Sequence, residues 1–304
     1  MGGTHQIAHA LQRYLCSHGG EFWVLSSVKK VIVENGRATG IQLEDGTKVE
    51  AKHLVVSNLH PVQTISLIEE HVSSEIKDKV KKIDSSGSCL YWGSIALHEP
   101  PKYKLAEVNP DVVTFRSYVL TADDFYFRYK MPAEIFSQGY ASIPDLHPYH
   151  QSTFDPTRAP KGKYELHFEL YAPPARYYTL KEWLKKKEEV FENLLKWWQR
   201  FAPNMTWDNI IAVHFNTPYE TQMKNSSMFE GCRSQITECA SQSDQYKPIP
   251  ELAGARTPIK NLYLSSVSNN PKGAVLGASG YICYKVIAED FNLIKVWEKA
   301  GRPY

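Results

Sequence analysis

Two pairs of histidines are the first residues whose type and spacing suggest chemistry. His5 and His9 stand four apart in a helical pattern, a spacing that can place two imidazoles on one metal ion. No acidic third ligand and no adjacent glutamate accompanies them, so we expect a surface or core role. His147 and His150 flank Pro148 in a loop, and we expect a structural role there too. The sequence therefore predicts no metal site.

Serines and cysteines give little support for nucleophilic or redox chemistry. No nucleophile elbow occurs, and the five cysteines contain no C-x-x-C pair. An odd, scattered set of thiols is typical of a reducing compartment, so we expect a cytoplasmic protein. The sequence shows neither a signal peptide nor an apolar run of about 18 residues that would predict a spanning helix. A net charge of +2 argues against nucleic acid as a partner.

The first 60 residues predict the elements that would position a site: a helix, a β-meander and a buried strand. An amphipathic helix is predicted over residues 4–18, and Gly19-Gly20 ends it. Turns at Asn35-Gly36 and Asp45-Gly46 predict hairpins. A short apolar run after them is typical of a strand in a parallel sheet, and Pro61 suits the first turn of a new helix. The predicted strands cover residues 22–25, 28–34, 38–43, 47–51 and 54–57.

The middle of the chain changes character. Residues 88–97 are aromatic and β-prone, and residues 164–172 alternate, with Glu165, His167 and Glu169 facing away from the apolar side chains. This pattern predicts a sheet with one buried and one wet face. A long helix follows over residues 179–201, with a capping box at its start.

The end of the chain again reads as strand, loop and helix. A strand is predicted over residues 261–264, a loop over 269–273 and a helix over 275–291, with glycines in its first turns. The chain as a whole is therefore expected to be α/β.

Several ordered stretches resemble one family, the phytoene desaturase and carotenoid isomerase-like flavoproteins, which include the pyridine nucleotide-disulphide oxidoreductase domain-containing protein 2-like group. The match spans nearly the whole chain, and ordered matches of such length are specific. It rests on Gly2-Gly3-Thr4, Leu11, Gly19-Gly20, Val28, residues 35–38, Gly40, Asp45-Gly46, residues 55–58, Pro61, residues 155–160, Gly162-Lys163, residues 171–173, residues 202–204, Thr217-Pro218 and residues 257–264.

The resemblance implies a fold and a division of the chain. The fold would be the C-terminal part of an FAD/NAD(P)-binding domain of Rossmann type, interrupted by an α+β substrate domain with an antiparallel sheet. Residues 1–60 would form a flavin-domain segment of helix, β-meander and sheet strand. Residues 61–251 would form the substrate domain, and residues 252–304 would return to the flavin domain.

The family's dinucleotide-binding motif is not found in this sequence. No G-x-G-x-x-G occurs, whereas the family holds the FAD pyrophosphate on that turn and the following helix. Either a second polypeptide supplies this half, or the chain is a piece of a longer one. We expect a partner protein that carries the half and shares FAD with this chain. Its strands would flank residues 54–57 and 262–265, and the chain alone should be insoluble or oligomeric.

The resemblance also assigns residues to the flavin. The segment from Asn270 to Ala278 aligns with the family's loop beside the isoalloxazine ring, where glycines permit close approach and a helix N-terminus faces the ring. Val28 would lie close to the adenine. The cofactor-binding residues implied are Val28, Ser57, Asn270, Pro271, Gly273, Val275, Leu276, Gly277 and Ala278.

Departures from the family pattern leave the catalytic residues open. Asn270 stands where histidine is usual, Lys272 replaces a glycine, and Glu238-Cys239 stand where the family has His-Gly. Lys272, Glu238 and Asn270 are therefore candidates only. These changes indicate either altered substrate chemistry or a degenerate flavin site.

Two functions follow from the resemblance. The first is a subunit or fragment of an FAD-dependent oxidoreductase of the desaturase, dehydrogenase or isomerase kind, inactive alone, acting on a small apolar substrate. The aromatic-rich middle region suits such a substrate but suits an ordinary core equally. The alternative is a non-catalytic structural subunit that keeps the fold as a docking surface. Peripheral contact with a membrane is compatible with both.

Overall fold

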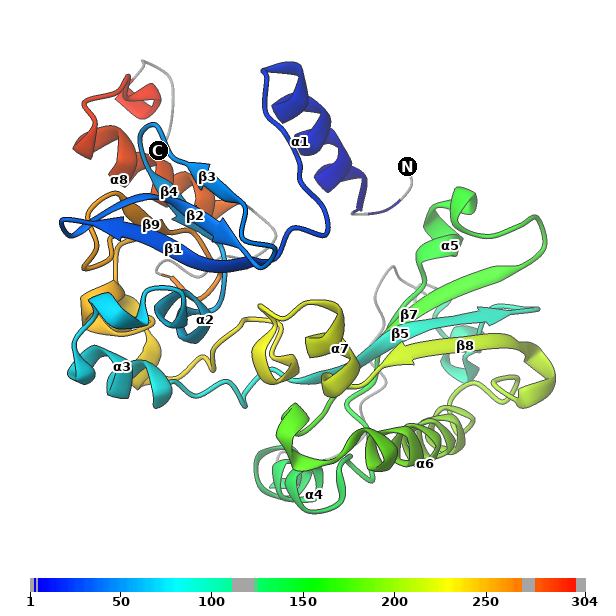
Figure 1. Cartoon of the computed structure of the whole chain (residues 1–304). Helices are drawn as coiled ribbons and strands as arrows, with labels where there is room; N and C mark the ends of the chain where they lie inside the picture. Colours follow the sequence, from blue (N-terminus) through cyan, green and yellow to red (C-terminus); the bar gives the residue numbers. More distant parts are fainter. Residues whose placement is uncertain (1–2, 4, 111–122, 124, 270–276, 299–304) are drawn as a thin grey trace. The chain divides into compact units, whose positions relative to one another are not determined.

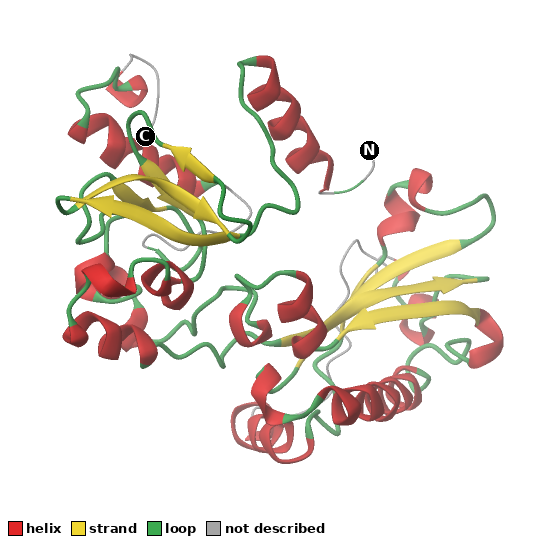
Figure 2. Cartoon of the chain, in the orientation of Figure 1, coloured by secondary structure: helices red, strands yellow, loops and turns green. Residues whose placement is uncertain are grey.

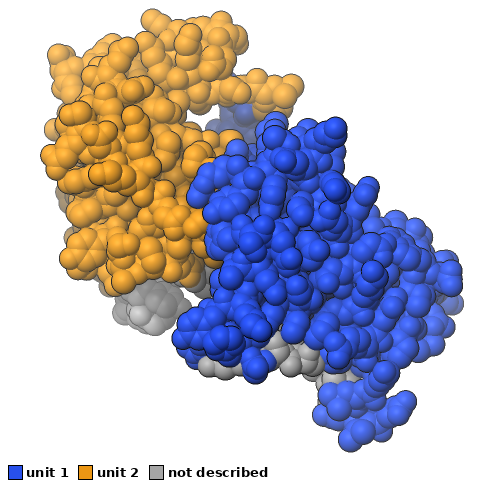
Figure 3. Space-filling model, turned by 90° about the horizontal axis from the view of Figure 1, so that it is seen from below, with its two compact units in different colours: residues 1–23, 89–224 blue, residues 24–88, 225–304 orange. Residues whose placement is uncertain are grey.

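The computed structural model describes residues 3, 5–110, 123, 125–269 and 277–298, and it divides the chain into two compact units (Figure 3). Residues 1–23 and 89–224 form one unit, which we call the antiparallel-sheet unit. Residues 24–88 and 225–304 form the other, the parallel-strand unit. Each is described by itself.

The units divide the chain at other positions than the expected 60/61 and 251/252. Helices α2 (Pro61–Ser66) and α3 (Ser74–Lys81) belong to the parallel-strand unit, because Ile65 and Val80 are buried in its core. Residues 225–251 also belong to this unit, and α1 (His5–Ser17) is grouped with the antiparallel sheet.

The parallel-strand unit is built on a meander and a parallel pair of strands (Figure 1). The meander has antiparallel strands β1 (Val28–Glu34), β2 (Arg37–Leu43) and β3 (Lys48–Glu50). Strands β4 (Val55–Ser57) and β9 (Leu262–Leu264) run parallel to each other. The two strands of this short pair are thus about 200 residues apart in the sequence. Its core consists of Val31, Ala38, Ile65, Ile68, Val80, Ile249, Leu252, Ile259, Leu262 and Leu264.

The strand expected over residues 22–25 does not form. Leu25 has a φ of +55°, outside the extended region, and the four side chains from Phe22 to Leu25 are exposed. An apolar run becomes a strand only when a neighbour accepts its main-chain groups, and the described residues offer none here.

The antiparallel-sheet unit has four strands covered on one face by a long helix. The strand order is β6 (His147–Tyr149), β7 (Tyr164–Tyr171), β5 (Leu90–Leu97) and β8 (Ile210–Asn216). The helix α6 (Leu180–Trp198) begins at the predicted capping box, in which the side chain of Thr179 accepts from Glu182 N.

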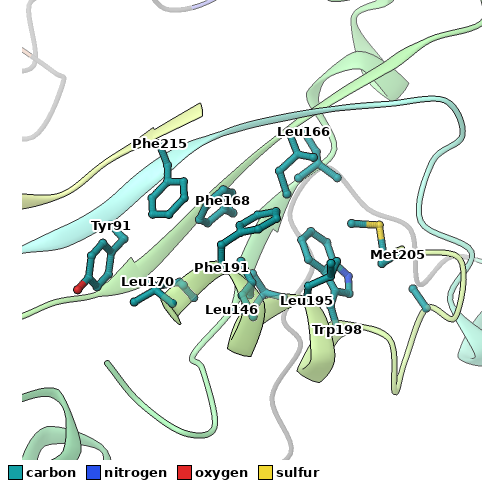
Figure 4. Packing of buried hydrophobic residues seen from close by; sticks show 14 of the residues in the cluster. Tyr91, Leu146, Leu166, Phe168, Leu170, Phe191, Leu195, Trp198, Met205 and Phe215 are labelled. Carbon is teal, nitrogen blue, oxygen red and sulfur yellow. The ribbon is translucent and has the colours of Figure 1, made fainter. Parts of the chain in front are cut away.

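Figure 4 shows how this unit packs. Leu166, Phe168 and Leu170 of β7 point toward the α6 side chains Phe191, Leu195 and Trp198. The strand's alternation and the helix's stripe therefore meet in one core, as their periodicities predicted.

Shorter helices complete the chain (Figure 2). They are α4 (Met131–Gln138), α5 (Gln151–Phe154), α7 (Pro218–Lys224) and α8 (Ala278–Asp290). The first helix, α1, has no buried residue, although its apolar side chains share one face. Among the described residues, no helix is long and apolar enough to cross a membrane.

Candidate functional site

The carboxyl ends of β4 and β9 lie at the same edge of the parallel pair. Ser57 ends β4, and its carbonyl oxygen accepts a hydrogen bond from Ser265 N, just after β9, at 2.8 Å. Ligands of open α/β sheets bind at the carboxyl ends of parallel strands. This edge is therefore the candidate site.

The helix that follows β9 begins with a glycine in a left-handed conformation. Gly277 is the N-cap of α8 with a φ of +69°, and no side chain caps the helix there. The first N–H groups of a helix lack partners within it and carry partial positive charge. The start of α8 is thus suited to an electron-rich group on a ligand. Ala278 is the first residue of α8, and residues 275 and 276, where the helix was expected to begin, lie outside the described residues.

Sequence reasoning missed a buried polar loop that leads away from β9. Ser266, Ser268 and Asn269 are all buried, and the Ser266 hydroxyl donates to Asn269 Oδ1 at 3.0 Å. Asn269 donates to Leu252 O at 3.3 Å, and Ser268 N donates to Gln235 Oε1 at 3.3 Å. The run of small polar residues directly after a buried strand was the available signal. This network fixes the backbone that leads toward residue 270.

The predicted cofactor-binding residues fall into three groups. Ser57 and Gly277–Ala278 belong to the strand end and the helix start just described. The Ser57 hydroxyl is 2.7 Å from Thr64 Oγ1, so it also secures α2. Val28 lies at the start of β1, paired with Leu43 in the meander. Outside the described residues are Asn270, Pro271, Gly273, Val275 and Leu276, as is the catalytic candidate Lys272.

Of the catalytic candidates, only Glu238 lies among the described residues. Its side chain is exposed in a loop of the parallel-strand unit. The neighbouring Thr237 N donates to Asp84 O at 2.7 Å, which holds this loop against residues 84–87. Glu238 remains a candidate on the basis of resemblance.

The two outer edges of the parallel pair differ, which corrects one expectation. Beyond β9, Leu264 N donates to Ala255 O at 2.7 Å and Leu262 N donates to Ile259 O at 3.1 Å. The chain's own residues 255–259 therefore cover the edge at which we expected strands of another polypeptide.

The edge beyond β4 is open in the part of the chain that the structure describes. Val55 N donates to Asn261 O, and Ser57 O accepts from Ser265 N, so both residues turn toward β9. In a parallel ladder the residue between them directs its N–H and C=O to the other side. Within the described ranges, no strand pairs with Val56 on that side, and the residue is 44% exposed.

A cavity of about 520 Å³ lies at the amino end of β9, and three of the polar groups that line it have structural roles. The Arg256 guanidinium donates to both carboxylate oxygens of Asp290, at 3.0 and 2.8 Å, and the Tyr263 hydroxyl donates to Asp290 Oδ2 at 2.8 Å. Arg256 holds the pKa of Asp290 below its usual range, and burial raises the pKa of Tyr263 to about 12. These groups satisfy one another and tie the end of α8 to β9.

Two buried histidines also have structural roles. His60 Nε2 is 3.2 Å from Ser85 Oγ, and burial lowers the His60 pKa to about 4. Burial likewise lowers the pKa of His150 to about 4, beside the Tyr103 hydroxyl at 3.4 Å. Among the described residues, no group of three or more His, Cys, Asp or Glu side chains could hold a metal ion.

Comparison with known proteins places this chain beside a group of oxidoreductases and isomerases. It is 24% identical to a subunit of limonene dehydrogenase from Castellaniella defragrans, over 97% of this chain and 56% of that protein. It is 23% identical to pyridine nucleotide-disulfide oxidoreductase domain-containing protein 2 of mouse, over 96% and 51%. Prolycopene isomerase of carrot is 24% identical, over 96% and 44%. No family model matches.

Solved structures support the same kind of fold. An oxidoreductase from Methanosarcina mazei matches 94% of this chain and 54% of its own, with a TM-score of 0.60 and 19% identity. A putrescine oxidase variant matches 96% and 53%, with a TM-score of 0.60 and 12% identity. The chain has a mixed α/β fold and is a relative of the phytoene desaturase and carotenoid isomerase-like proteins, which confirms the resemblance in its sequence. It spans about half the length of the curated relatives it matches.

Proposed function

We propose that this chain is one part of an FAD-dependent oxidoreductase that removes hydrogen from an apolar substrate. A polypeptide segment carrying strand, G-x-G-x-x-G and helix completes it, and FAD lies between the two. The same proposal includes the fold that the resemblance implies, a Rossmann-type FAD-binding domain that is interrupted by a substrate domain. When bound, FAD supplies two-electron oxidation.

The observation that carries the proposal is the β4–β9 pair, whose β4 edge is unpaired in the part of the chain that the structure describes, followed by α8. Carboxyl strand ends beside a helix N-terminus fit the flavin's ring edge, because the helix start favours negative charge on the reduced ring. Apart from its chain neighbours, no described heavy atom lies within 4 Å of a Cβ added at Gly277, which leaves space for close approach. The residues that would hold the ring edge are Gly277 and Ala278, while the loop before them is assigned by resemblance.

The need for a complementing segment is supported by uncovered apolar surface. One strand added beside Val56 would satisfy its main-chain groups and continue the sheet. The apolar face of α1 and residues 22–25 are also exposed, and soluble proteins rarely leave such continuous apolar stretches uncovered. A complementing segment of the size its relatives contain could cover them. The relative from Castellaniella is named as one subunit of its enzyme, which suits this arrangement.

An apolar substrate is supported by the relatives' names and by the antiparallel-sheet unit. Limonene, phytoene and prolycopene are hydrocarbons, and the relatives are named for acting on them. Trp92 and Tyr149 lie half-buried on the sheet face opposite α6, where aromatic rings can receive an apolar ligand.

The test is co-expression of this chain with a polypeptide that carries the dinucleotide-binding half. We expect the chain alone to be oligomeric or insoluble and flavin-free. The complex should be monodisperse, absorb near ~450 nm as oxidised flavins do, and lose that band anaerobically with limonene or phytoene. A well-behaved complex without flavin would instead support the structural-subunit alternative. A chain that folds alone as a monodisperse, cooperative monomer would contradict the need for a complementing segment.

A further inference from the structure

The cavity at the amino end of β9 is lined by residues of the parallel-strand unit alone. Its volume of about 520 Å³ lies within the range of roughly 300–1,000 Å³ that is usual for small-molecule sites. Strand β2 contributes Arg37, the end of α8 contributes Asp290 and Phe291, and residues 256–263 form the rest of the wall. The candidate site described above is at the carboxyl ends of β4 and β9, so this cavity is a separate feature of the same unit.

Two cationic side chains are neighbours at this cavity. Arg37, the first residue of β2, and Lys260, two residues before β9, are partners in a parallel bridge. Ala38 N donates to Lys260 O at 2.9 Å, and Lys260 N donates to Gly36 O at 3.0 Å. Within the described residues, neither cationic side chain has an ion pair or a hydrogen bond. Like charges at paired positions repel each other, so an anion bound between them would be stabilised.

The carboxylates in this region do not neutralise those two cations. Asp290 is the one carboxylate among the described residues that line the cavity, and Arg256 donates to it through Nε and Nη2. Arg256 Nη2 is also 3.7 Å from Glu289, while its Nη1 has no partner in the described part of the chain. Glu34 is in register with Arg37 across the hairpin turn but forms no ion pair with it. The cavity therefore has an excess of positive charge.

An aromatic ring gives the cavity an apolar wall. Phe291, the C-cap of α8, is half-buried and packs against a cluster that includes Tyr263 and Cys283. An inorganic anion would fill only a small part of a cavity of about 520 Å³. A phosphate ester can instead place its charged group on the cations and its organic body against the ring. Arginine and lysine are the side chains that bind phosphate in proteins.

We propose that this cavity binds a small organic phosphate, with Arg37 and Lys260 holding the phosphate group and Phe291 contacting the organic body. The C-terminal end of α8 carries partial negative charge, which opposes anion binding. Its last carbonyl groups, however, accept hydrogen bonds from the N–H groups of residues 291–293, which reduces that opposition. The inference goes beyond the proposed function, because it involves neither the flavin nor the dehydrogenated substrate.

The experiment uses the full chain in the soluble form that the co-expression above yields, and titrates it calorimetrically with AMP, inorganic phosphate and adenosine. We expect AMP to bind, and phosphate and adenosine each to bind at least about tenfold more weakly, because each lacks one of the two recognised groups. Arg37→Gln and Lys260→Gln should each weaken AMP binding by about tenfold, the effect of one lost charge-assisted hydrogen bond. Lys48→Gln, an exposed cation on β3 that does not line the cavity, is the matched control and should leave the affinity unchanged.

The outcomes distinguish this inference from the proposed function. The inference is overturned if AMP does not bind, or if it binds the Arg37→Gln/Lys260→Gln double variant as tightly as wild type. Adenosine binding as tightly as AMP would also overturn it, since the phosphate would then contribute nothing. Inorganic phosphate binding as tightly as AMP would overturn the role of Phe291. The flavin absorbance should be the same in every variant, and its absence from wild type would contradict the proposed function alone.

Discussion

The antiparallel sheet and the β4–β9 pair differ in which residues cover them. On the antiparallel sheet, α6 of the same unit supplies the cover, and Phe168 and Trp198 meet in a dry core. In the parallel pair, the chain covers the outer edge of β9 itself but leaves that of β4 unpaired among the described residues. The comparison shows that the antiparallel sheet has the cover of one face within its own unit, whereas β4 keeps one edge without a neighbouring strand among the described residues.

The largest expected effect tests the core between the antiparallel sheet and α6. Phe168→Ala should lower the free energy of unfolding by about 3–5 kcal/mol, because the ring is fully buried and contacts Phe191 and Phe215. Leu184→Ala, on the same α6 but 49% exposed, should cost less than about 1 kcal/mol. Urea unfolding of the complex measures both. Equal costs would contradict a core on that side of the sheet.

Lowering the pH tests the stability of both units, because each contains a buried histidine whose pKa is lowered. Burial lowers the folded-state pKa of His60 and of His150 to about 4, below the usual 6.5. The unfolded chain therefore binds protons first as the pH falls, and stability present above pH 6.5 is lost toward pH 4. We expect a loss of about 2–3 kcal/mol for each histidine over that window.

Hydrogen exchange at pH 7 and pH 5 can assign that loss to each unit. His60→Gln should flatten the pH dependence in the parallel-strand unit only, and His150→Gln in the antiparallel-sheet unit only. The loss would not arise from these histidines if both variants kept the wild-type slope in their own unit.

A pair of proline substitutions tests the open edge directly. Val55→Pro should destabilise the chain by about 1–3 kcal/mol, because it removes the N–H that donates to Asn261 O. Val56→Pro removes an N–H that faces the free edge, so it should change stability by less than about 1 kcal/mol. It should nonetheless weaken association with the complementing polypeptide by about tenfold or more, as measured by calorimetric titration. Unchanged association in Val56→Pro would exclude strand addition at this edge.

The smallest expected effect concerns the start of α8. Gly277→Val should lower flavin retention in the complex by about tenfold, because a branched side chain blocks close approach of the backbone to the ring. Its φ of +69° also strains any other residue. Gly254→Val is the control for strain, since Gly254 has a φ of +82° and equally open surroundings. The assignment of this helix start to the flavin fails if both variants retain flavin to the same degree.

Local patterns in the sequence predicted the elements that depend on local physics. The stripe and capping box of α6, the alternation of β7 and the Asn35-Gly36 turn all formed where expected, because periodicity and turn chemistry act within a few residues. The strand at residues 22–25 did not form, since strand formation depends on a neighbour that the local pattern does not specify.

The candidate site was predicted less completely for the same reason. Ser57 and Gly277 were assigned to the site through resemblance and stay predictions, whereas the buried loop at Ser266–Asn269 depends on distant partners such as Gln235 and Leu252. The cover of β9 by residues 255–259 and the partial shielding of His167, on the face of β7 that was expected to be wet, likewise arise from tertiary packing. Single-sequence patterns do not encode which distant side chain satisfies a polar group.

The ion pair between Arg256 and Asp290 and the hydrogen bond from Tyr263 to Asp290 hold the C-terminal end of α8 in place. Asp290 is the last residue of this 13-residue helix, so Gly277 lies about 20 Å away along the axis. A tilt of about 5° at the tied end would move the start of the helix by roughly 2 Å, and an error of about 1 Å can slow a reaction by about 100-fold. The contacts of Asp290 at the far end of the helix would therefore help to hold Gly277 in place, if the proposed flavin site is correct.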